Sequence, residues 1–274
     1  MDVKFLGLPI KRDLKLTYSV SIIIAILITG SSITGLLYPD QVYPSEDLVL
    51  AFLPNDIINL VVGLPILLVS IWLTSRGKLL GLLFWPGALF YVLYNYLIYV
   101  LAMPINMVSL ATLILVTLSA YALIDMFARL DRKAIREALS GTVPERLAGG
   151  VLMGLGSLFM LRVVVIFIGA IINQTQLPET EMALNISDFL MSPASIIGGL
   201  LLWQHKEMGY VFGLGLLFQQ SMLFIGLIAI LVIQPFMLDI PFAVSDVIVV
   251  FLMGLICFIP FFLYARGVFS IGMN

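Results

Sequence analysis

The chain has too few cysteines and histidines for a disulfide or a metal site. Among its 274 residues, Cys257 is the only cysteine and His205 the only histidine. An intrachain disulfide needs two cysteines, and a metal cage of Cys and His side chains needs several ligands, so the count excludes both. A haem held by two histidines of one chain is excluded for the same reason. We therefore predict no metal and no cofactor.

Charged residues are scarce as well, at 11% of the chain, against about a quarter in soluble domains. Hydrophobic residues reach 61%, so most of the surface must face lipid, and the lipid bilayer is the expected partner. The net charge of −2 comes without a basic surface of the size that a phosphate backbone requires. Nucleic acid is therefore excluded as a partner.

Signatures of catalysis are also missing. The chain contains no P-loop, no Rossmann glycine motif and no HExxH motif. A Ser–His dyad inside the bilayer would need a histidine at depth, whereas His205 lies next to Lys206 in an expected loop. We predict no catalytic residues, and a lipid-modifying enzyme is the least favoured of the functions considered.

What the chain has instead is eight apolar runs, each close to the roughly 20 residues that cross the hydrocarbon layer as a helix. They cover approximately residues 16–38, 55–75, 79–102, 105–128, 147–172, 188–204, 209–233 and 241–265. The first run is too long for the apolar part of a signal peptide, so we interpret it as an uncleaved span. The predicted fold class is all-α, a polytopic membrane bundle of eight transmembrane helices.

The positions of the basic residues predict the orientation of the spans. Thirteen of the fourteen Lys and Arg residues lie in the N-terminal segment, in every second connection, or after the last span. The alternate connections are acidic or short, and the first of them contains Asp40, Glu46 and Asp47. Because basic residues mark cytoplasmic loops, we predict that both termini are cytoplasmic.

The order of features repeats after four spans, which indicates an internal duplication. Several residues recur at an offset of 132 positions: Asp56 as Asp188, Gly77 as Gly209, and Gly81 as Gly213. We predict two tandem four-helix repeats, residues 1–132 and 133–274, within a single membrane domain. Each repeat has an even number of spans, so the two share one orientation and are related by an axis along the membrane normal.

The segment between the repeats, residues 129–141, places apolar side chains at helical spacing among charged ones. These are Leu130, Ala134, Ile135 and Leu139. The pattern is typical of a short interfacial helix on the cytoplasmic face. A plain charged linker explains it equally well.

The remaining basic residue, Arg162, lies inside the fifth span. At 1.5 Å per residue it is roughly 22 Å from the cytoplasmic side. A guanidinium at this depth costs from about 3 to more than 10 kcal/mol unless it is paired or hydrated. Three acids have estimated depths within reach of its side chain: about 24 Å for Asp188, 28 Å for Asp56 and 29 Å for Asp246.

Asp246 is the predicted partner of Arg162. Subtracting the repeat offset relates Arg162 to Gly30 and Asp246 to Ile114, so the second repeat contains both charges and the first contains neither. Two opposite charges that are absent together are easier to explain as a pair than as two independent costs.

Two hypotheses follow for this part of the chain. One is a polar cavity open to the outer face, in which Asp246, Asp188 and Asn95 surround Arg162. The alternative is a structural ion pair that orders the helices and binds nothing. Asp56 belongs to the candidate cluster by depth, but we favour helix capping for it, because it lies at the expected start of a span.

Three motifs cover much of spans two, three, six and seven. They are Asp56 followed by Gly63-Leu-Pro65, Arg76-Gly77 leading to Gly87-Ala-Leu-Phe-Tyr-Val-Leu-Tyr-Asn-Tyr96, and Asp188 before Pro193 with Gly209-Tyr210 downstream. In these motifs the chain resembles a family of uncharacterised prokaryotic integral membrane proteins. The resemblance implies eight spans and a location in a prokaryotic plasma membrane. It implies no chemistry.

The favoured function is a transporter or permease-like protein for a small polar or anionic solute, with Arg162 as the counter-charge and Asp246 and Asp188 balancing it. The alternative is a non-transporting membrane sensor or assembly module with a structural intramembrane ion pair. A cavity that reaches Arg162 would favour the first, and a dry pair sealed by aliphatic side chains the second.

Overall fold

The computed structural model describes residues 7–238 and 241–271, and this part of the chain is helical without β-strands. Eight of its helices are long and apolar enough to cross a membrane. They are α1 (Lys15–Leu37), α3 to α4 (Glu46–Ile58, the π-helical turn η1 at Asn59–Gly63, and Leu64–Ser75), α5 (Leu79–Ala102), α6 (Met107–Arg129), α8 (Glu145–Asn173), α9 (Glu179–Trp203), α10 (Glu207–Leu238) and α11 (Val244–Ile271). The predicted all-α bundle of eight spans is confirmed.

The second and sixth spans begin earlier than the sequence predicted. Their helices start at Glu46 and Glu179, nine residues before the predicted starts at 55 and 188. Hydropathy marks only the part of a helix that crosses hydrocarbon, whereas acidic residues in the first turn favour the positive end of the helix dipole and extend the helix into water. At the start of α3, the Ser45 hydroxyl also accepts a hydrogen bond from the Leu48 amide. These longer helices change the depth of every residue within them.

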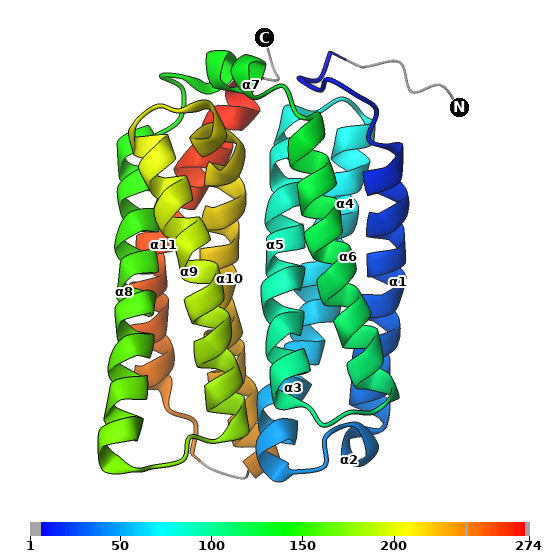
Figure 1. Cartoon of the computed structure of the whole chain (residues 1–274), viewed down its shortest axis with the longest axis vertical. Coiled ribbons are helices and arrows are strands. Elements are labelled where there is room, and N and C mark those ends of the chain that lie inside the picture. The colour runs from blue at the N-terminus through cyan, green and yellow to red at the C-terminus, as the bar shows by residue number, and fades with distance from the viewer. Residues whose placement is uncertain (1–6, 239–240, 272–274) are drawn as a thin grey trace.

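Figure 1 shows the long helices side by side in two groups. One group contains α1, α3 to α4, α5 and α6, and the other contains α8, α9, α10 and α11. The first residues of α1 and the last of α11 lie at the same end of the bundle as the short helix α7 (Arg132–Leu139), while α2 (Pro39–Val42) lies at the other end. The two groups meet mainly through α5 and α10.

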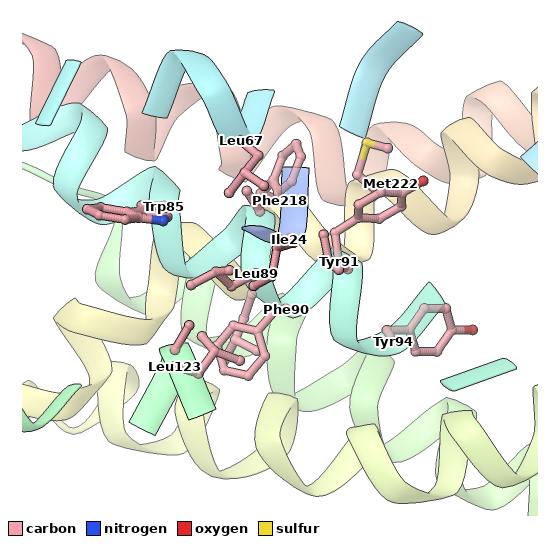
Figure 2. Packing of buried hydrophobic residues seen from close by; sticks show 14 of the residues in the cluster. Ile24, Leu67, Trp85, Leu89, Phe90, Tyr91, Tyr94, Leu123, Phe218 and Met222 are labelled. Atoms are coloured by element: carbon pink, nitrogen blue, oxygen red, sulfur yellow. The ribbon is translucent and has the colours of Figure 1, made fainter. Parts of the chain in front are cut away.

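Small residues allow α5 and α10 to approach closely. A Cβ atom added at Gly87 of α5 would lie 2.7 Å from the Cα atom of Gly215 on α10, which is the kind of contact that drives helix association in lipid. The surrounding core is drawn from both groups, and Figure 2 shows part of it. The labelled members include Ile24, Leu67, Leu89, Phe90, Leu123 and Phe218.

Many large apolar side chains are exposed on the outside of the bundle. Examples from α8 and α11 are Leu161, Val165, Ile172, Leu252 and Phe269, each more than half exposed. In water such a surface would be unfavourable, but in a bilayer it contacts acyl chains. Together with the length of the helices, this surface shows a membrane-embedded protein.

The segment between the two groups is a helix and not a plain linker. Asp131 caps α7, because its carboxylate accepts a hydrogen bond from the Ala134 amide at 3.3 Å. Ile135 and Leu139 are fully buried, and α7 packs against α10 and α11. The apolar face of this amphipathic helix is therefore covered by the protein itself and does not lie on lipid.

Candidate functional site

Arg162 is paired with Asp188. Its Nη1 atom lies 3.6 Å from Oδ2 of Asp188. At 1.5 Å per residue, Arg162 is about 16 Å from the end of α8 at Asn173, and Asp188 is about 14 Å from the start of α9 at Glu179. The short connection between α8 and α9 makes them antiparallel neighbours, so these similar distances from their shared end bring the two side chains together.

The prediction that Asp246 is the partner of Arg162 is wrong. Helix α11 begins at Val244, so Asp246 lies in its first turn, about 13 Å nearer the end of the bundle than Arg162. Its side chain is exposed and accepts a hydrogen bond from the Ser245 hydroxyl at 3.1 Å. The estimated depth was too small because α11 extends past the predicted end of the eighth span to Ile271.

A tyrosine from the other group of helices also binds Asp188. The hydroxyl of Tyr94 on α5 donates to Oδ1 of Asp188 at 2.8 Å. Figure 2 shows the Tyr94 side chain pointing away from the packed core. Asp188 is only 4% exposed, whereas the Arg162 side chain is 42% exposed. The acid is therefore the buried member of the pair, and the base is the accessible one.

The accessible side of Arg162 lines a cavity of about 460 Å³ between the two groups of helices. Its polar lining consists of Asn55, Tyr91, Tyr94, Asn95, Arg162 and Asp188. The rest is apolar, with residues such as Leu158, Phe159, Leu227 and Ile256. A second cavity of about 770 Å³, between α4, α5, α10 and α11, contains no charged residue in its lining. Only the first cavity combines a charge pair with an apolar wall.

Asn95, which the sequence analysis placed in the candidate site, lies in the wall of this cavity. Its Nδ2 atom donates to Oδ1 of Asn59 at 2.9 Å, and the Tyr91 hydroxyl donates to the same oxygen at 2.7 Å. Asn59 is the first residue of η1, and such π-helical turns occur often at functional sites. The sequence analysis did not identify Asn59, because an amide inside an apolar run gives no pattern of its own.

Asp56 is not a helix cap. It lies about 15 Å from the start of α3 at Glu46 and is 1% exposed. The hydroxyl of Tyr43 donates to its Oδ2 atom, and the hydroxyl of Tyr99 donates to Oδ1 at 3.1 Å. Burial, followed by the charge of Asp56 and the hydrogen bond to it, raises the pKa of Tyr43 far above its usual value. Tyr43, which lies just after α2, therefore stays a hydrogen-bond donor.

The sequence analysis did not identify the tyrosines that donate to the two carboxylates, although a signal was present. Four of the ten tyrosines fall within nine positions of the third span, and they are Tyr91, Tyr94, Tyr96 and Tyr99. All four are buried. Tyrosine is common at membrane interfaces, so such a cluster in mid-span indicates polar groups that need hydrogen-bond donors.

Within residues 7–238 and 241–271, no group of three or more His, Cys, Asp or Glu side chains is placed to hold a metal ion. The pair of Arg162 and Asp188 places one cation at the cavity wall and one anion behind it. No family model, no curated protein and no solved structure matches the chain.

Proposed function

We propose that the chain is a transporter or permease-like membrane protein that binds a small anionic solute in the cavity at Arg162. The observation that supports this best is the unequal burial of the pair. Asp188 is almost completely buried behind the guanidinium, while the guanidinium itself faces the cavity. A pair that only orders the helices would not require an accessible base.

The guanidinium has donors to spare for a solute. It carries five N–H groups in a planar fork, and among the described residues its one acidic neighbour is Asp188, at a single Nη1 contact of 3.6 Å. The remaining donors can bind a carboxylate, sulfonate or phosphate group, for which this fork is well suited. The site is deep in the bilayer, where water screens charges little, so the attraction of an anion is stronger than at a surface.

The apolar wall favours a solute that also has an apolar part. Most residues around the cavity are Leu, Ile, Phe or Met, and most of these belong to α8, α10 and α11. A fully hydrated inorganic anion would lose water here without compensating contacts, whereas a short alkyl chain would gain them. We therefore expect organic anions to bind better than inorganic ones.

The internal duplication is part of the proposal. Helix α5 of the first four spans packs against α9, and α10 of the second four spans packs against α3. This reciprocal pair of contacts is what two related halves, residues 1–132 and 133–274, would make. Parallel repeats of this kind are known in transporters, with the solute site near the repeat interface, and the cavity lies between α5 and helices of the second half.

We also propose that α7 and both termini are cytoplasmic and that the membrane is a prokaryotic plasma membrane. The basic connections support the orientation, since Arg76, Lys78 and Lys133 all lie at the α7 end of the bundle. The resemblance to uncharacterised prokaryotic membrane proteins supports the location.

A second candidate function is a non-transporting sensor or assembly module. The hydrogen bond between Tyr94 and Asp188 favours it, because it ties α5 to α9 and gives the ion pair a role in holding the two groups of helices together. In that case the cavity would bind no solute, and loss of Arg162 would affect stability alone.

Flux measurements in liposomes distinguish the two candidates. The purified protein is reconstituted, and entry of labelled methanesulfonate, butanesulfonate and inorganic phosphate is followed, since all three stay charged and do not cross lipid as neutral acids. We expect butanesulfonate to enter fastest, and Arg162→Met to lower its rate by about tenfold or more, the effect of losing a charge-assisted hydrogen bond.

The control is Arg146→Met, which removes an exposed arginine from the same helix far from the cavity and should leave the rate unchanged. Entry no faster than in protein-free liposomes for all three anions would contradict the proposal. Equal rates for wild type and Arg162→Met would contradict it as well.

A further inference from the structure

We propose that Asp56 is a proton-binding site inside the membrane, and that its carboxyl group takes up and releases a proton during the functional cycle of the protein. Its carboxylate oxygens contact the hydroxyls of Tyr43 and Tyr99, and no Lys, Arg or His of the described chain lies within ion-pair distance of it. Asp188, at nearly the same depth in α9, has Arg162 as its partner. Asp56 is thus the buried acid without a counter-charge.

Two opposing effects act on this carboxyl group. Its burial in an apolar environment favours the neutral acid, because an unpaired ion cannot be desolvated at low cost. The two tyrosine hydroxyls favour the anion, because a carboxylate accepts both of their hydrogen bonds. A basic partner would fix the group as an anion, and a purely apolar pocket would fix it as an acid. The site at Asp56 does neither, so both forms are accessible.

The surroundings of Asp56 are shaped to admit these hydroxyls. On α1, Gly35 lies directly against the site, and a Cβ atom added there would collide with Oδ2 of Asp56 and with the Tyr43 hydroxyl. The titratable groups that face Asp56 are Tyr43, from the segment between α2 and α3, and Tyr91, Tyr96 and Tyr99 from α5. Tyr43 connects the site with the α2 end of the bundle.

Hydrogen-bonding side chains also lead from Asp56 toward the cavity. The ring of Tyr99 lies 5.2 Å from that of Tyr96, centroid to centroid. The Tyr96 hydroxyl accepts from Nδ2 of Asn59 at 3.4 Å. Asn59 in turn accepts hydrogen bonds from Tyr91 and Asn95, which both line the cavity. These contacts connect Asp56 with the cavity wall, and the step between Tyr99 and Tyr96 is a ring contact and not a hydrogen bond.

The proton site itself does not depend on the proposed transport function. If the proton site and the transport function both exist, a proton bound at Asp56 would offset the charge of an anion bound at Arg162. The pair would then carry less net charge across the membrane than the anion alone, as in proton-coupled uptake. The experiment below uses no solute, so its outcome is independent of the flux measurements.

Infrared difference spectroscopy tests the proposal on the complete protein in lipid bilayers, between about pH 6 and pH 9, where exposed carboxyl groups stay ionised. We expect the C=O stretching band of a protonated carboxyl group in an apolar environment to disappear as the pH rises. It should be absent in Asp56→Asn and retained in Asp246→Asn, which removes an exposed acid. A band that does not change with pH, or one that persists in Asp56→Asn, would overturn the proposal.

A second variant covers the case in which Asp56→Asn does not fold. Tyr99→Phe removes one donor to the carboxylate and keeps the ring packed against Phe52 and Tyr96. The loss of a hydrogen bond to the anion should move the midpoint of the band's disappearance upward by about one pH unit or more. An unchanged midpoint would show that the band does not come from Asp56, and the proposal would be wrong.

Discussion

Arg162→Met and Asp188→Asn each break the same ion pair, yet we expect them to destabilise the protein by different amounts. Removing the base leaves Asp188, which is 4% exposed, with the Tyr94 hydroxyl as its remaining charge-stabilising contact. Removing the acid leaves Arg162, whose side chain is 42% exposed to the cavity. An uncompensated charge costs most where water cannot reach it, so the variant that keeps the buried acid is the worse one.

The structure also sets the size of the difference. Breaking a buried pair by removing one partner costs about 3–5 kcal/mol of unfolding free energy. In Arg162→Met the stranded Asp188 can lose its charge by binding a proton. At pH 7 this costs about 1.4 kcal/mol for each of the about three pH units between the ordinary pKa of an aspartate and pH 7. The cost of leaving this charge unpaired is therefore limited to roughly 4 kcal/mol. For Asp188→Asn the stranded guanidinium can still be hydrated from the cavity, so we expect a cost at or below the lower end of that range, about 3 kcal/mol. The double variant keeps no charge and should cost less than Arg162→Met alone.

The unfolding free energy can be measured by denaturant titration in micelles. Arg146→Met is the control for the loss of an arginine from α8, and its unfolding free energy should stay within about 0.5 kcal/mol of the wild-type value. The cost of Arg162→Met should also shrink as the pH is lowered toward 5, since the stranded acid is then protonated more easily. Equal costs for the two single variants, or a double variant whose cost is the sum of both, would refute the reasoning.

One further prediction concerns orientation. In intact cells, a membrane-impermeant maleimide should label Glu46→Cys at the start of α3 and should not label Lys133→Cys in α7. The native Cys257 is buried and should give no background labelling. The reverse pattern would invert the proposed orientation.

The eight spans could be predicted from the sequence because hydrophobic length alone decides whether a helix can cross a bilayer. The depth of individual residues could not, because it depends on where each helix ends in the water layer. Asp246 shows the consequence. Its depth was estimated from an eighth span that ended near residue 265, but α11 continues to Ile271 and carries Asp246 to the end of the bundle. Arg162 is paired with an acid, as predicted, but the positions of the helix ends determine which acid lies at its depth.

Asp56 shows a different limit. Apolar composition placed the start of the second span at residue 55, and a carboxylate at a helix start is an ordinary cap. The nine additional residues from Glu46 turn the same carboxylate into a group buried in mid-helix. Its neighbours Tyr43 and Tyr99 lie 13 and 43 positions away in the sequence, and tyrosine packs as readily as it donates a hydrogen bond. Pairwise contacts of this kind require the three-dimensional arrangement.

The arrangement gives α5 a special position between the two acids. Through Tyr99 it donates to Asp56 in the first half, and through Tyr94 it donates to Asp188 in the second. A carboxylate that gains a proton loses acceptor capacity, which weakens its bond to the tyrosine that donates to it. Because both tyrosines belong to one rigid helix, a shift of α5 that follows a change of charge at Asp56 would alter the hydrogen bond at Asp188 as well, and with it the acid that holds Arg162 at the cavity wall.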